Sequence, residues 1–115
     1  MPDRATLVFD ERLIAYDFGP SHPLNPVRVD LTMQLARELG VVDWLDVVTA
    51  EPCTDEQLAT VHRPDYIARV AEISADPTQT DAFIGLGTSD NPVFAGMHEV
   101  GAHIAGASVE AARRV

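Results

Sequence analysis

The sequence has few of the features that mark secreted, membrane-bound or nucleic-acid-binding proteins. It contains a single cysteine, Cys53, so no disulfide can form within the chain, and we expect a reducing, cytoplasmic location. Only 8 of the 115 residues are lysine or arginine, against 18 aspartates and glutamates, which gives a formal net charge of −10. This charge repels phosphate backbones and anionic lipid head groups, so no binding to nucleic acid is expected.

Long hydrophobic runs are also missing. Asp10 and Glu11 break the apolar run near the N-terminus, so neither a signal-peptide core nor a membrane span is predicted there. The sequence has no GxSxG nucleophile motif, and Cys53 has no identified base partner. Hydrophobic residues nevertheless make up 46% of the chain and charged residues 23%, a balance that supports a packed core. At this length we expect a single folding unit.

The order of the predicted elements indicates an open α/β sheet. Two short apolar runs, residues 5–10 and 44–50, predict buried strands. Three prolines exclude both a helix interior and a central strand from residues 16–28, which we therefore predict to be a loop. A helix is predicted over residues 30–39, so the pattern is strand, loop, helix, strand.

Apolar spacing predicts which helix faces are buried. In the 30–39 helix one face is apolar, and we expect it to pack on the rest of the fold; it consists of Leu31, Leu35, Ala36 and Leu39. Thr54 is predicted to cap a second helix, and Pro64 to open a third. The aromatic side chains of Trp44 and Tyr66 are expected in the core.

The last predicted helix, residues 93–115, is rich in small residues. Its glycines lower helix propensity, so we expect another element to pack very closely against it. It runs to the last residue with no C-terminal cap. We therefore expect residues 1–115 to form part of a larger domain.

Two stretches resemble known motifs but do not meet the requirements of their chemistry. His98 and His103 resemble an HExxH zinc motif, but they lie five residues apart, so the two imidazoles diverge by roughly 140° around a helix. GLGTSD, residues 85–90, resembles a dinucleotide loop, but the Asp90 carboxylate would repel a pyrophosphate. Asp90 is alternatively a plausible N-terminal cap of the long helix that follows Pro92.

The loop 16–28 holds a concentration of polar groups after a strand, a placement that suits a binding site. These groups are Tyr16, Asp17, His22, Asn25 and Arg28. In a purely structural alternative, Arg28 pairs with Asp17 or Asp30, and His22 binds a backbone carbonyl. The residues alone leave both interpretations open.

The run YDFGPSHPLNPVR, residues 16–28, resembles the opening loop of the histone deacetylase and acetoin-utilisation deacetylase family, especially its bacterial branch. Three later pieces resemble, in order, the family's His-x-x-x-Tyr-Ile helix, its Asp-x-Pro-Val-Phe loop and its small-residue helix; they are VHRPDYIARV, SDNPVFAGMHEV and GAHIAGASVEAARRV. The resemblance covers nearly the whole chain. It implies an arginase-like α/β fold with a parallel sheet, of which residues 1–115 would be the N-terminal portion of one domain.

The resemblance also implies a zinc-dependent hydrolase that acts on acetylated lysine or a small acylated amine. Asp90 would hold substrate backbone amides at the rim of the acyl-lysine tunnel, Arg28 would line an internal channel, and His22 and Tyr16 would lie near that channel. The family's Asp-x-His zinc ligands, His-His pair and late tyrosine do not occur in this sequence. We therefore expect the chain alone to bind no zinc and to be inactive. The alternative is a non-catalytic acidic α/β module that self-associates or binds a protein partner.

Overall fold

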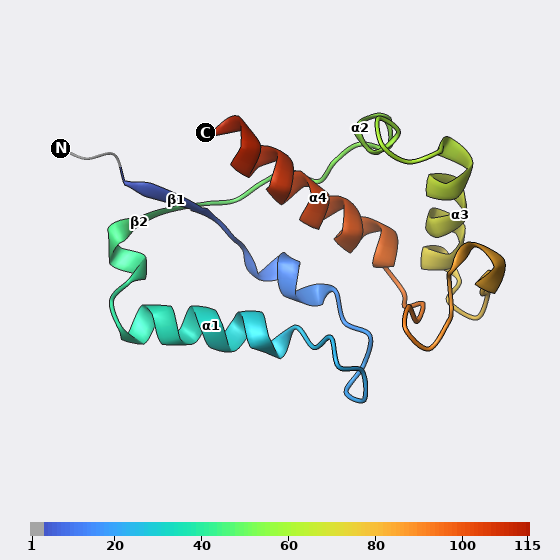
Figure 1. Ribbon diagram of the computed structural model, residues 1–115, viewed down its shortest axis with the longest axis horizontal. Helices are drawn as coiled ribbons and strands as arrows, with labels where there is room; N and C mark the ends of the chain where they lie inside the picture. The colour runs from blue at the N-terminus through green and yellow to red at the C-terminus, as the bar shows by residue number, and fades with distance from the viewer. Residues whose placement is uncertain (1–3) are drawn as a thin grey trace.

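The computed structural model describes residues 4–115 (Figure 1). The structure measures 52 × 33 × 18 Å, and its radius of gyration is 16.2 Å, larger than the roughly 13 Å expected of a compact domain of this length. In chain order the helices (α), 3₁₀ turns (η) and strands (β) are β1 (Ala5–Val8), η1 (Glu11–Ala15), α1 (Val27–Glu38), η2 (Val42–Trp44), β2 (Leu45–Val48), α2 (Asp55–Leu58), α3 (Pro64–Ala75), η3 (Ala82–Ile84) and α4 (Met97–Arg113).

The two strands pair in parallel, as the predicted strand–helix–strand order requires. Ala5 lies opposite Leu45 and Val8 opposite Val48, with α1 in the connection between the strands. The pairing continues one residue beyond β1, where the Phe9 N–H donates to the Val48 carbonyl at 2.9 Å. The predicted α/β class is therefore confirmed for the described residues, although both strands are shorter than predicted.

The prediction that Trp44 lies in the core is wrong. Trp44 is 79% exposed because β2 begins one residue later and Trp44 itself ends the 3₁₀ turn η2, from which its side chain faces solvent. Tyr66, in contrast, packs against the core, as predicted.

The predicted apolar face of α1 is not buried within residues 4–115. Leu31, Leu35 and Leu39 are 56%, 59% and 69% exposed, whereas the buried residue of the helix is Met33. The helix is therefore turned so that the side with Met33, and not the leucine row, borders the groove beside β1. The helix also begins at Val27, earlier than predicted, because Pro26 provides an N-cap with helical dihedral angles.

The core lies between α3, the segment before α4, and α4 itself. Its buried members are Ile73, Leu86 and Met97, and Ile73 is completely shielded from solvent. The predicted helix starts are confirmed here. Thr54 and Gln57 form a reciprocal capping box at α2, and Pro64 occupies the first turn of α3.

The N-terminus of α4 is capped by another helix instead of by Asp90. The helix begins at Met97. The N-cap residue is Gly96, which has a φ of +80° and no side chain, so the N-cap residue cannot supply a side-chain hydrogen bond. The Ser74 hydroxyl from α3 accepts a hydrogen bond from the His98 N–H at 3.1 Å and donates one to Glu99 at 2.8 Å. The interpretation of Asp90 as the cap is therefore wrong, because the Ser74 hydroxyl accepts the hydrogen bond of a first-turn N–H that has no partner within the helix.

Close packing on α4 is confirmed at one glycine. A Cβ atom on Gly106 would lie 1.9 Å from the carbonyl oxygen of Glu51, whereas a Cβ on Gly101 would meet nothing within 4 Å. Gly106 therefore lets the backbone after β2 approach the helix directly.

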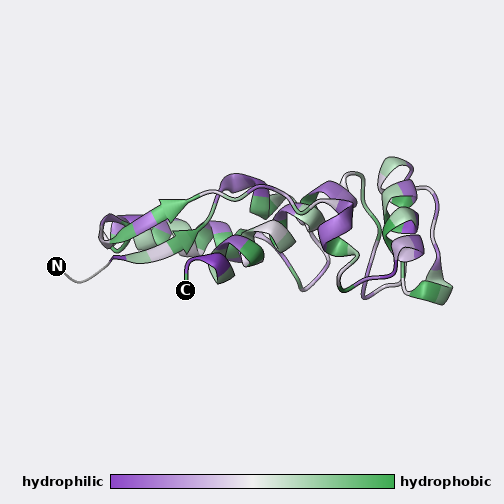
Figure 2. Ribbon diagram, turned by 90° about the horizontal axis from the view of Figure 1, so that it is seen from above, coloured by the Kyte–Doolittle hydropathy of each residue, from purple (hydrophilic) through white to green (hydrophobic). Residues whose placement is uncertain are grey.

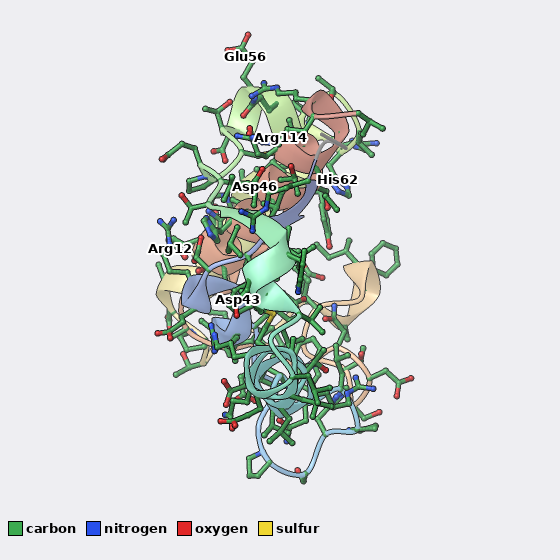
Figure 3. The ribbon with its side chains drawn as sticks, turned by 90° about the vertical axis from the view of Figure 1, so that its left-hand side faces the viewer. Arg12, Asp43, Asp46, Glu56, His62 and Arg114 are labelled. Carbon is green, nitrogen blue, oxygen red and sulfur yellow. The ribbon has the colours of Figure 1, made fainter. Side chains whose placement is uncertain are left out.

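Charged side chains lie around the periphery, and Glu56 projects from one end of the molecule (Figure 3). Hydrophobic residues follow both strands and also occupy the outlying turn η3 (Figure 2). Among residues 4–115, no helix combines the length and the apolar character needed to cross a membrane.

Candidate functional site

Two loops that are far apart in the sequence are joined by aromatic contacts. Phe94 packs edge-on against Tyr16 and Phe18, with ring centroids 5.2 and 5.8 Å apart. Tyr16 and Phe18 are themselves 5.1 Å apart. Aromatic pairs at these distances favour such edge-to-face arrangements. The contacts place the loop before α1 beside the loop before α4. These two loops carry three of the four predicted site residues, and the fourth, Arg28, is the second residue of α1.

His22 makes a hydrogen bond across these two loops. Its Nε2 atom lies 3.1 Å from the backbone carbonyl oxygen of Asp90, and its Nδ1 atom lies 3.0 Å from the Leu24 N–H. The interpretation that His22 binds a backbone carbonyl is thus correct, and the carbonyl belongs to another predicted site residue. The structure therefore brings His22 and Asp90 together.

Asp90 lies on a loop whose backbone is fixed on both sides. The Asn91 N–H donates to the Thr88 hydroxyl at 3.1 Å, and the Asn91 side-chain amide donates to the Gly85 carbonyl at 2.7 Å. The Gly87 N–H donates to the Asn91 carbonyl at 2.9 Å. The Asp90 side chain is exposed, and none of the ion pairs or side-chain hydrogen bonds among residues 4–115 uses its carboxylate. The loop thus presents a free anion on a constrained backbone.

Tyr16 is half-buried where the two loops meet. Burial raises the pKa of its hydroxyl, so the group is a neutral hydrogen-bond donor over the physiological range. The residue lines a cavity of about 260 Å³ between α3 and α4, together with Tyr66, Asn91, His98 and Gly101. Asn91 thus connects this cavity to the loop that presents Asp90.

Arg28 lies in the first turn of α1 and makes neither of the ion pairs considered from the sequence. The Asp17 carboxylate accepts the Gly19 N–H, and Asp30 accepts the side-chain amide of Gln34. Within residues 4–115 Arg28 forms no salt bridge. Instead it lines an apolar groove of about 890 Å³ beside β1, which Tyr16 also lines. The salt-bridge interpretation is therefore wrong, and Arg28 remains available to a ligand.

The histidines of α4 contact different partners, as their spacing predicts. His98 Nε2 lies 3.0 Å from an Asp55 carboxylate oxygen, and His103 Nε2 lies 2.8 Å from Asp10. Among residues 4–115, no three His, Cys, Asp or Glu side chains gather into a possible metal site. A zinc ion that activates water needs about three protein ligands, so the described residues do not fit one by themselves.

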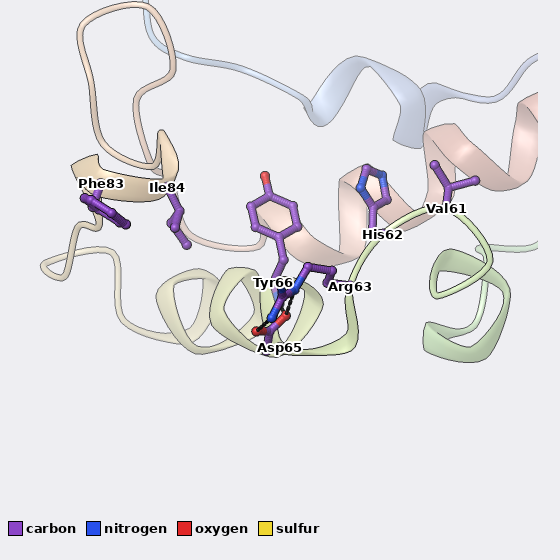
Figure 4. A pocket seen from close by; sticks show the side chains of 7 residues that line it. All are labelled: Val61, His62, Arg63, Asp65, Tyr66, Phe83 and Ile84. Atoms are coloured by element: carbon purple, nitrogen blue, oxygen red, sulfur yellow. Dashed lines mark hydrogen bonds and ion pairs between the residues drawn. The ribbon is translucent and has the colours of Figure 1, made fainter.

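A second depression lies beside η3, next to the cavity that Tyr16 lines (Figure 4). It has a volume of about 660 Å³, and its walls are Val61, His62, Arg63, Asp65, Tyr66, Phe83 and Ile84. Arg63 and Asp65 pair with each other at 2.7 Å, and Phe83 is 99% exposed. The charged groups here are therefore already paired, and no predicted site residue lies in this depression.

Comparison with known proteins identifies the family of this chain. Residues 22–115 match the family model for the histone deacetylase domain. The chain therefore belongs to the histone deacetylase domain family, and it is a deacetylase-family protein. Its small parallel sheet is compatible with the α/β fold of such a domain.

Individual relatives come from bacteria and eukaryotes. The chain is 36% identical to the acetoin utilization protein AcuC of Bacillus subtilis over 110 residues, which cover 94% of this chain and 28% of that protein. It is 30% identical to histone deacetylase 1 of rice, over 92% of this chain and 21% of the relative. The AcuC protein of Staphylococcus xylosus is 29% identical over 94% of this chain and 29% of its own length. The chain thus spans less than a third of each of these relatives.

Sequence reasoning missed Phe18, Phe94 and Asn91, which hold the two loops in place. Phe18 and Phe94 are aromatic residues inside loops that also contain Gly or Pro, and this combination was the available signal. Nothing in the sequence indicated that Asn91 would bind the Gly85 carbonyl, because that bond depends on how the loop folds back on itself.

Proposed function

We propose that this chain forms the rim and part of the channel of a zinc-dependent deacetylase that hydrolyses acetyl-lysine or a related acylated amine. The observation that carries the proposal is the free Asp90 carboxylate on a fixed loop, joined through His22 to the loop before α1. An ionised carboxylate accepts charge-assisted hydrogen bonds from backbone N–H groups. Asp90 would therefore hold the substrate backbone at the rim.

Arg28 and Tyr16 are proposed to line the channel. Both border the groove beside β1, where Arg28 supplies a permanent positive charge that suits a carboxylate product, and Tyr16 supplies a neutral hydroxyl. We further propose that the complete domain has an arginase-like fold, works in the cytoplasm and obtains its zinc ligands from residues other than 1–115. The identity to AcuC proteins supports assignment to the acetoin-utilisation branch.

The proposal is tested with a protein of family length that carries this chain. We expect stoichiometric zinc and turnover of an acetyl-lysine peptide from that protein, and neither from residues 1–115 alone. A family-length protein without zinc and without turnover would end the deacetylase proposal. Zinc binding and turnover by the 115-residue chain would instead show that it is wrong to place the metal outside this segment.

A second candidate function, a module that associates with itself or with a partner protein, is favoured by the exposed row on α1. Leu31, Leu35 and Leu39 recur every four residues on the surface of that helix. We expect Leu31→Gln with Leu35→Gln to increase the monomer fraction in sedimentation, and the exposed control Arg37→Gln to leave it unchanged. An equal monomer fraction in the two variants would exclude this surface as the association site.

A further inference from the structure

His22 has both ring nitrogens engaged, which defines its tautomer. A backbone N–H can only donate, so Nδ1, which receives the Leu24 N–H, carries no proton. The hydrogen is therefore on Nε2, and it points toward an acceptor, the Asp90 carbonyl oxygen. One ring thus serves two segments that lie 68 residues apart in the sequence.

The ring is also held in place by its neighbours. Phe18 packs on it with ring centroids 4.7 Å apart and planes tilted by 57°. Phe18 contacts Phe94 in the other loop, and Pro23, next in sequence to His22, restricts the backbone there. Aromatic packing between the two loops therefore supports the hydrogen bond from His22 to Asp90.

The bond acts on the residue whose carboxylate is proposed to meet the substrate. The Asp90 carbonyl belongs to the peptide unit between Asp90 and Asn91, and Asn91 is fixed through Thr88 and Gly85. Holding this carbonyl as well fixes the backbone that sets the direction of the Asp90 side chain. We propose that His22 is a positioning residue, which orients Asp90 for the substrate backbone by donating from Nε2 to its carbonyl.

This inference rests on the proposed function for its kinetic consequence, but the contact itself can be tested separately. Two amide substitutions divide the functions of the imidazole. In His22→Gln, the terminal amide nitrogen takes the place of Nε2 and keeps the donor toward Asp90. In His22→Asn, the shorter side chain keeps an acceptor for Leu24 and loses the reach to Asp90. The asparagine variant therefore keeps the local turn at Leu24, and the glutamine variant keeps the contact between the two loops.

In a family-length protein we expect His22→Asn to lower kcat/KM for an acetyl-lysine peptide by about fivefold, the factor for one hydrogen bond between neutral groups. The loss should appear in KM with kcat nearly unchanged, because the contact serves binding. His22→Gln should retain most of the wild-type value. If the asparagine variant matches the wild type, or if glutamine does no better than asparagine, the positioning inference is wrong.

Hydrogen exchange on the 115-residue chain separates this inference from the deacetylase proposal. The Gly87 and Asn91 amides should exchange faster in His22→Asn than in the wild type and in His22→Gln, because their loop loses its anchor. This readout needs neither zinc nor activity. Unchanged protection in His22→Asn would contradict the inference even if the deacetylase proposal held, whereas altered protection would support it even if turnover were never observed.

Discussion

The imidazole Nε2 atom of His103 lies 2.8 Å from an Asp10 carboxylate oxygen, and this contact joins α4 to the N-cap residue of η1, two residues beyond β1. His103 is only 3% exposed. The Arg12 guanidinium gives the same carboxylate two more hydrogen bonds, at 3.1 and 3.2 Å. The N-terminal strand and the last helix are thus connected by a polar contact as well as by apolar packing.

This contact predicts a loss of stability in acid. Hydrogen bonding from Arg12, and less strongly from His103, lowers the pKa of Asp10 from 3.8 to about 2. Since the folded pKa lies below the unfolded one, the contribution is present above pH 3.8 and disappears as the pH falls toward 2. It amounts to at most roughly 2 kcal/mol, and to less in salt because the Arg12 side chain is exposed.

Urea unfolding of the wild type and of Asp10→Asn across this pH range measures the effect. We expect the wild type to be more stable at neutral pH and the difference to shrink as Asp10 becomes protonated. A difference that stays constant from pH 7 to pH 2 would show that the Asp10 charge contributes nothing to folding.

Two glycines of α4 provide a matched pair. Gly106→Ala places a methyl group against the Glu51 backbone, which cannot move like a flexible side chain, so we expect destabilisation of about 1–3 kcal/mol. Gly101→Ala faces open space and should stabilise the helix by up to about 1 kcal/mol. Thermal unfolding of the two variants compares them directly, and equal effects would mean that α4 does not pack on the segment after β2.

The cap that α3 supplies to α4 can be tested in the same way. Ser74→Ala removes the acceptor for the His98 N–H and the donor to Glu99, and we expect a loss of about 1 kcal/mol. Ser108→Ala is the control, because its exposed hydroxyl reaches only the Ile104 carbonyl of its own helix. Chemical denaturation that showed similar losses for both would argue against capping by Ser74.

Local signals in the sequence predicted local structure well. The oxygen of Thr54 and the restricted backbone of Pro64 act within one helical turn, so the starts of α2 and α3 followed from the residues alone. The start of α4 did not, because its cap comes from Ser74 on another helix. Burial was also hard to predict, since the exposure of Trp44 depends on where β2 begins.

The candidate site was only partly predictable, for a similar reason. Residue chemistry left two interpretations of the loop 16–28. The structural alternative holds for His22 and fails for Arg28, and the binding-site interpretation stays a prediction. His22 does bind a carbonyl, whereas Arg28 makes no salt bridge and faces a groove. The contact between His22 and Asp90 could not be foreseen, because aromatic packing between distant loops determines it.

Asp90 is proposed to hold the substrate backbone at the rim and to take no part in metal binding. The most direct test measures kcat/KM and zinc content of Asp90→Ala in a family-length protein, with the exposed neighbour Ser89→Ala as control. We expect kcat/KM to fall about tenfold or more, as for the loss of a charged hydrogen bond, while zinc content and the control stay at the wild-type level. Equal loss of zinc and activity, or undiminished activity, would contradict this function of Asp90.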